Sequence, residues 1–390
     1  MERFPKKLTL RLQRRAEGNL IRKLPAASNG LIDFSSNDYL GLARDETLFK
    51  EAFTILNNSG LKCSGATGSR LLSGNHPLYL ELENLLLEFH ETKAALVFNS
   101  GYDANIGFFA AVPQRGDVIF YDELIHASIR DGIQMSNAKS YKFRHNDLED
   151  LTSKTNSLGL HDARSDNSEV YIVTESVFSM DGDTPNLIET VGFCEENEYH
   201  LIVDEAHAIG VYGDQGRGLL QELKLHEKVF ARIVTFGKAI GGHGAAILGS
   251  KDLKRYLVNF ARSFIYTTAL PPHSLATVLA AYQFLGRSSG VKKRQKLLEN
   301  IKYFNHQIQD VGLDKRFVPS NSSIHCCIVP GNAKIKRLTR SMQEAGFNVK
   351  PILSPTVAKG KERIRFCLHS ENDREQIAQV LEVLNQYLKE

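Results

Sequence analysis

The fold of this chain is decided by the stretch LIVDEAHAIG at residues 201–210, in which a short apolar run ends in two acidic residues and a histidine. The run lacks the polar–apolar alternation of a half-buried strand, so it is typical of a strand that is covered on both faces. Similar apolar runs occur at residues 94–98, 117–121, 170–174, 233–236 and 246–249. Helical patterns separate these runs, and strands that alternate with helices predict an α/β fold with a large, mostly parallel sheet.

The chain is long enough for more than one domain. It has 390 residues, and a domain takes roughly 100–200 residues. We expect an N-terminal helix and strand segment over residues 1–45, a large α/β domain over residues 46–275, and a smaller C-terminal α+β domain over residues 276–390.

The C-terminal part mixes strands with helices. Strands are predicted near residues 323–329 and 363–368. Ser370 together with Asp373 predicts the cap of a final helix whose apolar residues share one face. Further upstream, the polar segment 152–168 is predicted to be a loop between a helix and the next strand.

Composition and charge exclude several classes of protein. Apolar residues make up 42% and charged residues 24%, which is ordinary for a globular protein and excludes a collagen-like or wholly disordered chain. The net charge is only +3, so we expect neither nucleic acid nor an anionic membrane as the main partner. No stretch approaches the roughly 20 apolar residues of a membrane span.

The cysteines indicate a reducing compartment. The chain has five, an odd number, with no C-x-x-C pair, so neither a disulfide framework nor a zinc site is expected. The basic N-terminus lacks the continuous apolar core of a signal peptide. A cytoplasmic protein without a bound metal is the resulting prediction.

The acidic pair could also belong to a helicase. Asp204-Glu205-Ala206-His207 spells D-E-A-H after an apolar strand, a pattern typical of the metal-binding strand end of such enzymes. That interpretation needs a phosphate-binding loop of the form G-x-x-x-x-G-K-[ST]. Neither Gly237-Lys238 nor Gly360-Lys361 has the following Ser or Thr or the leading Gly, so the sequence speaks against a helicase.

Lys238 and Asp204 together indicate a different chemistry. An enzyme that uses pyridoxal 5'-phosphate needs a lysine for a Schiff base and a carboxylate that keeps the pyridine nitrogen protonated. In an open α/β sheet such groups come from the carboxyl ends of neighbouring strands. Asp204 ends one predicted strand, and Lys238 follows another and precedes the glycine-rich residues 241–244. A solvated loop lysine is the alternative, but these packed surroundings favour catalysis.

A phosphate site is predicted at the start of a helix. Asn99-Ser100-Gly101-Tyr102 follows the run at 94–98 and opens a helical pattern, whose free N–H groups suit a phosphate. Gly101 allows the backbone to approach closely. An ordinary strand-to-helix turn remains the alternative. His126 is either an ordinary core or surface histidine or a ring that lies flat on the pyridine.

These features belong to a pattern that covers nearly the whole chain. The sequence resembles the α-oxoamine synthases, a branch of the fold-type I, aspartate aminotransferase-like, pyridoxal phosphate enzymes. The matching segments are SSNDYLGL at 35–42, TGSR at 67–70, TESVFSMDGD at 174–183, VDEAH at 203–207, TFGK at 235–238, FAR at 260–262 and RIR at 363–365.

The resemblance implies a role for each residue around the cofactor ring. Lys238 carries the cofactor and moves the α-proton, and Asp204 pairs with the pyridinium nitrogen. His126 stacks on the ring, while His207 and Ser179 face its phenolic oxygen. Lys238, His126, Asp204 and His207 are accordingly the predicted catalytic residues.

The remaining implied contacts concern the phosphate and the substrates. The phosphate lies against the backbone of Gly101 and Tyr102 and the hydroxyl of Thr235. Thr267 matches a position that contacts the phosphate from the partner subunit, so a homodimer is implied. The positions that hold the carboxylate of the amino acid are Asn37 and Arg365.

The implied reaction is a decarboxylating condensation of an amino acid with an acyl thioester. Within the family, the chain is most similar to members that join L-alanine to a pimeloyl thioester, on coenzyme A or a carrier protein, in biotin synthesis. Residues 244–246, Gly-Ala-Ala, carry part of this similarity. Members that use glycine or serine remain alternatives, and a non-catalytic scaffold with this fold is a remote one.

The acyl-tail pocket departs from the family pattern. Ile21 and Leu353 stand where enteric members carry arginines, and Arg22 is adjacent to the first. Arg22 is therefore the predicted contact of the acyl tail.

Overall fold

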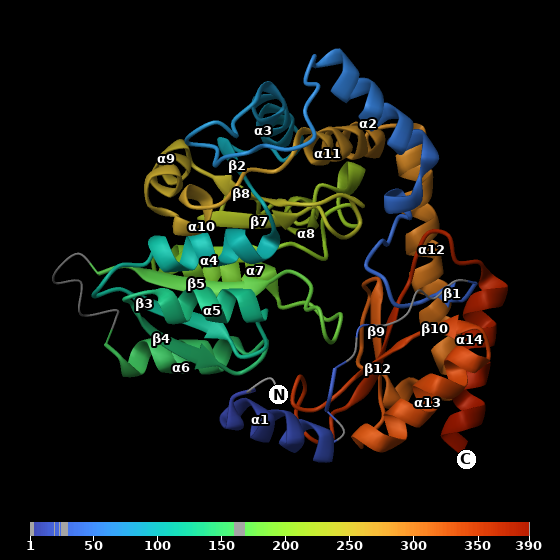
Figure 1. Ribbon diagram of the computed structural model, residues 1–390. Helices are drawn as coiled ribbons and strands as arrows, with labels where there is room; N and C mark the ends of the chain where they lie inside the picture. The colour runs from blue at the N-terminus through green and yellow to red at the C-terminus, as the bar shows by residue number, and fades with distance from the viewer. Residues whose placement is uncertain (1–3, 19, 23, 25–29, 160–167, 390) are drawn as a thin grey trace. The chain divides into compact units, whose positions relative to one another are not determined.

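The computed structural model describes residues 4–18, 20–22, 24, 30–159 and 168–389 (Figure 1). These residues form two compact units, which are described separately. The larger unit comprises Asn37–Ser179 and Asp183–Leu298, and the smaller unit comprises Met1–Ser36, Met180–Gly182 and Glu299–Glu390. The division between the units falls at Leu298, inside the long helix that spans Ser288–Asp310, whereas the sequence predicted a boundary at residue 275.

The larger unit contains a seven-stranded sheet with the order β2-β8-β7-β6-β5-β3-β4. Strand β8 is antiparallel to both of its neighbours, and every other pair of neighbouring strands is parallel. This confirms the predicted α/β class with a mostly parallel sheet. The strands are β2 (Ala94–Phe98), β3 (Val118–Asp122), β4 (Lys139–Phe143), β5 (Val170–Glu175), β6 (His200–Asp204), β7 (Ala231–Thr235) and β8 (Ala245–Gly249).

Helices of this unit cover the two faces of the sheet or pack on other helices. They are α2 (Glu46–Asn58), α3 (Pro77–Phe89), α4 (Gly101–Ala111), α5 (Ala127–Met135), α6 (Leu148–Ser157), α7 (Leu187–Glu196), α8 (Leu219–Glu222), α9 (Lys251–Phe260), α10 (Arg262–Ile265) and α11 (Pro272–Leu285), with the 3-10 helices η1 (Leu42–Arg44) and η2 (Asp214–Gly216). Ile119 belongs to a core cluster that includes side chains of α4, α5 and α9. Its neighbour Phe120 belongs to a second cluster with side chains of α6, α7 and α8. Successive strand residues therefore enter different cores, which explains the continuous apolar runs.

Two local predictions are wrong in this unit. Strand β4 was not expected, because its sequence KSYKF is polar and mostly exposed at the edge of the sheet, so it lacks an apolar run. The polar segment 152–168 is not a loop throughout, since α6 continues to Ser157. Helix α6 is amphipathic enough to bury Leu151 and Thr155, and residues 160–167 lie outside the described part.

The smaller unit combines small sheets with helices. Its three-stranded antiparallel sheet has the order β11-β12-β9, and β1 pairs with β10 in parallel. The strands are β1 (Ile32–Asp33), β9 (Ile324–Ile328), β10 (Phe347–Asn348), β11 (Lys350–Ile352) and β12 (Arg363–Cys367). The helices are α1 (Lys6–Glu17), α12 (Ser288–Asp310), which begins in the larger unit, η3 (Asp314–Arg316), α13 (Asn332–Glu344) and α14 (Arg374–Lys389).

The final helix begins later than predicted. Asp373, not Ser370, immediately precedes α14, and its Oδ1 accepts the backbone N–H of Gln376 at 2.8 Å. The Gln376 side chain in turn accepts the N–H of Asp373 at 3.3 Å, which completes a capping box. The apolar face is confirmed, since Ile377 and Leu384 are fully buried.

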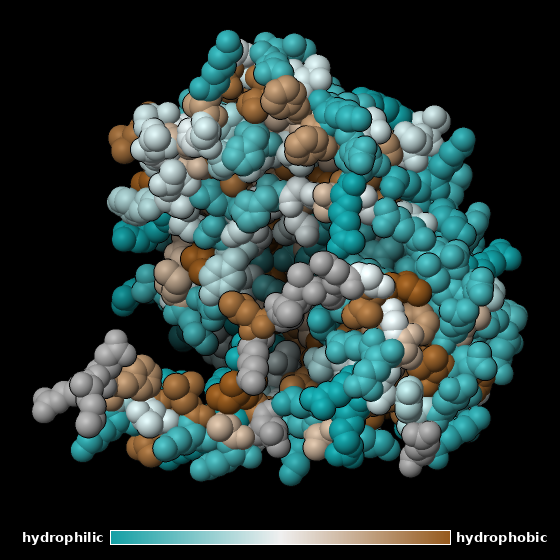
Figure 2. Space-filling model, turned by 45° about the vertical axis from the view of Figure 1, so that its right-hand side comes forward, coloured by the Kyte–Doolittle hydropathy of each residue, from teal (hydrophilic) through white to brown (hydrophobic). Residues whose placement is uncertain are grey.

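Two further observations concern the molecule's surroundings. Among the residues described, no helix is long and apolar enough to span a bilayer, and Figure 2 shows a face on which hydrophilic residues predominate. All five cysteines lie in the described part, and no disulfide joins any of them.

Candidate active site

The larger unit contains a cavity of about 240 Å³ at the carboxyl ends of β5, β6 and β7 and the N-terminal ends of α4 and α5. The parallel strands deliver their last residues to one edge of the sheet, as expected for an open α/β fold. The cavity lining includes eight predicted site residues, namely Asn37, Gly101, Tyr102, His126, Asp204, His207, Thr235 and Lys238.

Lys238 lies in the nine-residue connection, 236–244, between the antiparallel strands β7 and β8. The connection is closed by backbone hydrogen bonds from Phe236 N to Gly244 O at 2.9 Å and from Gly242 N to Phe236 O at 2.7 Å. Gly244 has a φ of +113°, which disfavours any other residue. The glycine cluster thus shapes the loop that presents Lys238 to the cavity.

Asp204 is the last residue of β6, the strand next to β7, and is 5% exposed. Its Oδ1 accepts the backbone N–H of Ala206 at 2.9 Å, and its Oδ2 accepts Nδ2 of Asn105 at 3.1 Å. Donors on both oxygens hold the carboxylate in one orientation toward the cavity.

His126 immediately precedes α5 and caps it. Its Nδ1 accepts the N–H of Ser128 at 3.3 Å and lies 2.7 Å from the Ser128 hydroxyl. Nδ2 of Asn105 also donates to the Ser128 hydroxyl at 3.0 Å. The Asn105 amide therefore links the carboxylate of Asp204 to the hydroxyl that contacts the His126 ring. Desolvation and the charge of Lys238 lower the pKa of His126 against the opposing effect of Asp204. A neutral ring suits stacking on a pyridine.

His207 is 6% exposed, and its Nδ1 lies 2.7 Å from the hydroxyl of the fully buried Tyr39. The same hydroxyl donates to Oδ1 of Asn37 at 3.2 Å. Tyr39 therefore orients two predicted site residues at once.

The residues present fit the phosphate of the cofactor. Ser100 caps α4 by accepting the N–H of Asp103 at 3.0 Å, which directs the first N–H groups of the helix toward the cavity. A Cβ on Gly101 would lie 2.6 Å from Cγ2 of Thr235, so only glycine allows this approach. Within the described part, Oγ1 of Thr235 is buried and has no hydrogen-bond partner. A buried hydroxyl beside a helix N-terminus is a donor set that a phosphate would satisfy.

Sequence reasoning missed Glu175 in this site. Glu175 ends β5 and pairs in register with Asp204 on β6. Its Oε1 accepts the N–H of His126 at 2.6 Å. Burial and the nearby charge of Asp204 raise the pKa of Glu175 to about 8. The signal was present, because Glu175 ends its apolar run just as Asp204 does.

Asn105, Ser128 and Tyr39 were also missed. Asn105 and Ser128 carry no local pattern that distinguishes them from ordinary helix residues, whereas Tyr39 lies in the matching segment SSNDYLGL without any role being predicted for it. Their roles follow only from side-chain hydrogen bonds to Asp204, His126 and His207.

Four predicted site residues do not line this cavity. Ser179 lies in the loop after β5, and Thr267 lines a different, small cavity, where Asn99 Nδ2 donates to its Oγ1 at 3.1 Å. Arg365 and Arg22 belong to the smaller unit. Arg365 is buried on β12 with its Nη1 2.9 Å from Sγ of Cys367, whereas Arg22 is exposed.

The chain is similar to known proteins over most of its length. The family described as aminotransferase class I and II matches residues 29–384. The 8-amino-7-oxononanoate synthase of Emericella nidulans is 39% identical, over 97% of this chain and 94% of that protein. A putative 8-amino-7-oxononanoate synthase of Bacillus cereus is 41% identical, over 88% of this chain and 84% of that protein.

The chain is also similar to solved structures over most of its length. A serine palmitoyltransferase of Sphingomonas wittichii superposes with a TM-score of 0.86 and 28% identity, over 100% of this chain and 98% of that one. An 8-amino-7-oxononanoate synthase of Francisella tularensis superposes with a TM-score of 0.75 and 30% identity, over 93% of this chain and 98% of that one.

Proposed function

Since this chain belongs to the aminotransferase class I and II family and, within it, to the pyridoxal phosphate-dependent α-oxoamine synthases, we propose that it condenses L-alanine with a pimeloyl thioester. The products would be 8-amino-7-oxononanoate, carbon dioxide and the free thiol. The observation that carries the proposal is the cavity shared by Asp204, which ends β6, and Lys238, which lies in the connection that follows the neighbouring strand β7. The relatives named 8-amino-7-oxononanoate synthase support the choice of substrates.

Pyridoxal phosphate, when bound, supplies an electron-accepting ring conjugated to the α-carbon of the amino acid. Lys238 would hold the cofactor through its amine and then move the α-proton. Asp204 would keep a proton on the ring nitrogen, for which its two donors already orient it. His126 would cover one face of the ring and exclude water from it.

The phosphate would be bound by the N-terminus of α4 at Gly101 and Tyr102 and by the hydroxyl of Thr235. His207 and Ser179 would donate to the phenolic oxygen, His207 with its ring oriented by Tyr39. Thr267 would reach the phosphate of the partner subunit in a homodimer.

The amino acid would be recognised by its carboxylate. We assign this contact to Asn37 and Arg365, because a guanidinium binds a carboxylate through two parallel hydrogen bonds. For the acyl tail, Arg22 is the proposed contact. Ile21 and Leu353 offer no charge to the tail, so we propose weaker discrimination against uncharged tails than in arginine-bearing relatives.

Serine palmitoyltransferase activity is the second candidate, since serine palmitoyltransferase structures superpose with TM-scores of 0.86. Glycine C-acetyltransferase is the third. A non-catalytic scaffold is disfavoured, because Lys238 and Asp204 are both present and line one cavity.

A substrate matrix tests these candidates. L-alanine, glycine and L-serine are each combined with pimeloyl, octanoyl, acetyl and palmitoyl thioesters, on coenzyme A and on carrier protein, and products are identified by mass. We expect L-alanine with pimeloyl thioester to be turned over fastest, and Lys238→Ala to retain the fold but lose all turnover. Faster turnover of glycine with the acetyl thioester would identify the protein as a glycine C-acetyltransferase instead. Faster turnover of serine with the palmitoyl thioester would identify it as a serine palmitoyltransferase.

The same matrix tests Arg22. Arg22→Ala should narrow the preference for pimeloyl over octanoyl thioester, since an unpaired tail carboxylate gains nothing over a methyl end. An unchanged ratio in a wild type that strongly prefers pimeloyl would show that another basic residue binds the tail.

A further inference from the structure

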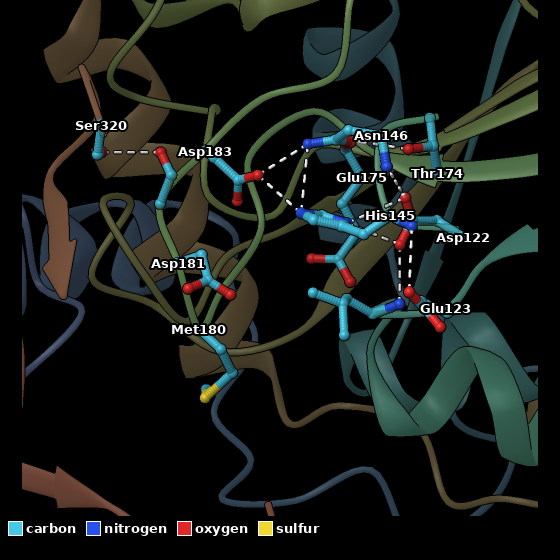
Figure 3. A network of polar contacts seen from close by, with 12 residues as sticks. Asp122, Glu123, His145, Asn146, Thr174, Glu175, Met180, Asp181, Asp183 and Ser320 are labelled. Atoms are coloured by element: carbon cyan, nitrogen blue, oxygen red, sulfur yellow. Dashed lines mark hydrogen bonds and ion pairs between the residues drawn. The ribbon is translucent and has the colours of Figure 1, made fainter. Parts of the chain in front are cut away.

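A second group of titratable side chains in the larger unit centres on His145, just after β4 (Figure 3). Its Nδ1 lies 2.9 and 3.1 Å from the two carboxylate oxygens of Asp122, and its Nε2 lies 2.7 Å from Oδ2 of Asp183. The side chain of Asp122 is fully buried, and those of His145 and Asp183 are only 21% and 22% exposed. Figure 3 shows the imidazole between the two carboxylates.

This geometry determines the protonation state of the ring. An ionised carboxylate only accepts hydrogen bonds, so each ring nitrogen of His145 must donate, and only the imidazolium has two N–H groups. Phe178 packs edge-on against the ring with centroids 4.5 Å apart, and the ring also lines a cavity of about 450 Å³ together with Asp122. Burial lowers the pKa of His145, but the hydrogen bonds to Asp122 and Asp183 outweigh it and raise the pKa to about 9.

Other groups contact the ring or its two carboxylates, and Nδ2 of Asn146 lies 3.3 Å from Nε2 of His145. Oε1 of Glu123 accepts the backbone N–H of His145 at 3.4 Å. Asn146 donates its Nδ2 to Oδ2 of Asp183 at 2.8 Å and its backbone N–H to Asp122 at 2.8 Å. In the described part of the chain, no second cation is recorded in an ion pair with either Asp122 or Asp183.

Asp122 belongs to the connection that carries His126. It is the last residue of β3, and its Oδ1 accepts the N–H of Leu124 at 2.8 Å, which forms a turn just before His126. The position of the His126 backbone therefore depends on Asp122 at one end and on Glu175 at the other.

Asp183 belongs to the loop that carries Ser179. Its carbonyl oxygen accepts the N–H of Phe178 at 3.0 Å, so residues 178–183 form a closed turn. Ser179 follows Phe178 directly, and its backbone position is set by this turn. His145 thus joins the loop of His126 to the loop of Ser179.

We propose that His145 is a positioning residue, a half-buried imidazolium that bridges Asp122 and Asp183 and so fixes the Ser179 loop against the His126 loop. The roles of Ser179 and His126 rest on the proposed function, whereas the bridge itself does not. Without the cation, two carboxylates would face each other at short range and repel, and the two loops would separate.

Variants of the bridge test this role in the holoenzyme. In His145→Gln we expect the dissociation constant of pyridoxal phosphate to rise roughly tenfold or more and kcat to fall by a similar factor, with KM for the amino acid within about threefold. His200→Gln is the matched control, because His200 also contacts a carboxylate, Glu169 at 2.8 Å, at the start of β6. It should change each quantity by less than about twofold.

The double variant His145→Gln with Asp183→Asn separates charge from packing. If repulsion between the carboxylates separates the loops, removal of one charge should relieve it. The double variant should therefore bind the cofactor several-fold more tightly than His145→Gln alone, whereas two independent packing defects would weaken binding further. No recovery, or wild-type affinity in His145→Gln, would overturn the proposal. If His145→Gln does not fold, the protonation state of the His145 ring in the wild-type protein, measured by nitrogen NMR, decides instead, and a neutral ring at neutral pH overturns the proposal.

Nitrogen NMR of the labelled ring gives a readout that needs no turnover. Near neutral pH both ring nitrogens of His145 should be protonated, and the ring should titrate at about pH 9. A neutral ring at neutral pH would exclude the bridge. Absence of turnover with L-alanine and pimeloyl thioester would instead contradict the proposed function and leave the NMR result standing.

Discussion

Two carboxylates lie side by side in this site, and their surroundings give them different properties. Glu175 and Asp204 are register partners at the ends of β5 and β6. Asp204 accepts two donors, whereas Glu175 is buried with its pKa raised to about 8 by desolvation and by Asp204. Near neutral pH the raised pKa therefore favours a protonated Glu175, while two hydrogen-bond donors orient the carboxylate of Asp204.

Asp204→Asn should slow proton exchange at the α-carbon of L-alanine more than it weakens cofactor binding. A neutral amide cannot hold the pyridinium proton, while the phosphate contacts at Gly101 and Thr235 remain. We expect a loss of roughly 100-fold or more in the exchange rate, measured by deuterium uptake, and less than about tenfold in cofactor affinity. Unchanged exchange would show that Asp204 does not face the ring nitrogen.

Arg365→Ala should weaken the apparent affinity for L-alanine. Loss of a bidentate, charge-assisted pair costs on the order of 2–5 kcal/mol when the partner charge stays buried, so KM should rise at least roughly tenfold. Arg365→Lys keeps the charge without the planar fork and should fall between wild type and Arg365→Ala. Equal KM values in all three proteins would remove Arg365 from the substrate site.

At the scale of elements, the connection between β6 and β7 depends on a buried ion pair. Glu205 directly follows Asp204, and its Oε2 accepts Nε of Arg232 on β7 at 2.7 Å, with both side chains at most 3% exposed. Oε1 of Glu205 accepts the N–H of Leu220, and Arg232 also donates to the carbonyl of Arg217. The pair thus anchors the loop that begins at Asp204.

Glu205→Gln should destabilise the fold strongly, because it leaves the Arg232 guanidinium buried without a counter-charge. The expected loss in the free energy of unfolding is about 3–5 kcal/mol, measured by urea denaturation. Exchange of both residues for methionine should cost less than Glu205→Gln alone. The exposed pair of Lys228 and Glu195, 2.8 Å apart, is the control, and its removal should cost less than about 1 kcal/mol.

At the scale of the whole molecule, the pH dependence of stability follows from His145. Its pKa rises from 6.5 to about 9 on folding, so the stabilisation is fully present below pH 6.5 and is lost as the pH rises through 9. The rise of about 2.5 in the pKa corresponds to on the order of 3 kcal/mol. The melting temperature of the holoenzyme should therefore fall between neutral pH and pH 9, and His145→Gln should flatten this part of the profile. Parallel profiles for the two proteins would contradict the assignment.

The proposed homodimer is testable by subunit mixing. Phe260 and Tyr266, 57% and 73% exposed, precede Thr267 in the sequence and suit a subunit interface. Lys238→Ala and Thr267→Asp should each be inactive alone. If Thr267 serves the partner's site, random mixing should restore about a quarter of wild-type activity, since half the dimers have one intact site. No recovery after verified exchange would place Thr267 in its own subunit's site or in none.

Periodicity and motif spacing were enough to predict much of this protein. The buried strands are marked in the sequence as apolar runs, and Lys238 with Asp204 indicates the cofactor chemistry from the sequence alone. Both signals are local, because a strand buried on two faces must be apolar along its length, and a group at its carboxyl end is marked by its position in the sequence. Strand β4 was not predicted, because a strand at the edge of a sheet need not be apolar.

The sequence alone was enough to predict the fold class, the family and a lysine and an aspartate that line one cavity, whereas only the tertiary structure decided what surrounds these two residues. Asn105 meets Asp204 across 99 positions of the chain, His126 meets Glu175 across 49, and Tyr39 meets His207 across 168. Such hydrogen bonds depend on which strands become neighbours and which loops meet at one edge of the sheet. The packing of the whole unit decides which strands become neighbours. A local sequence pattern cannot specify a hydrogen-bond partner that lies so far along the chain.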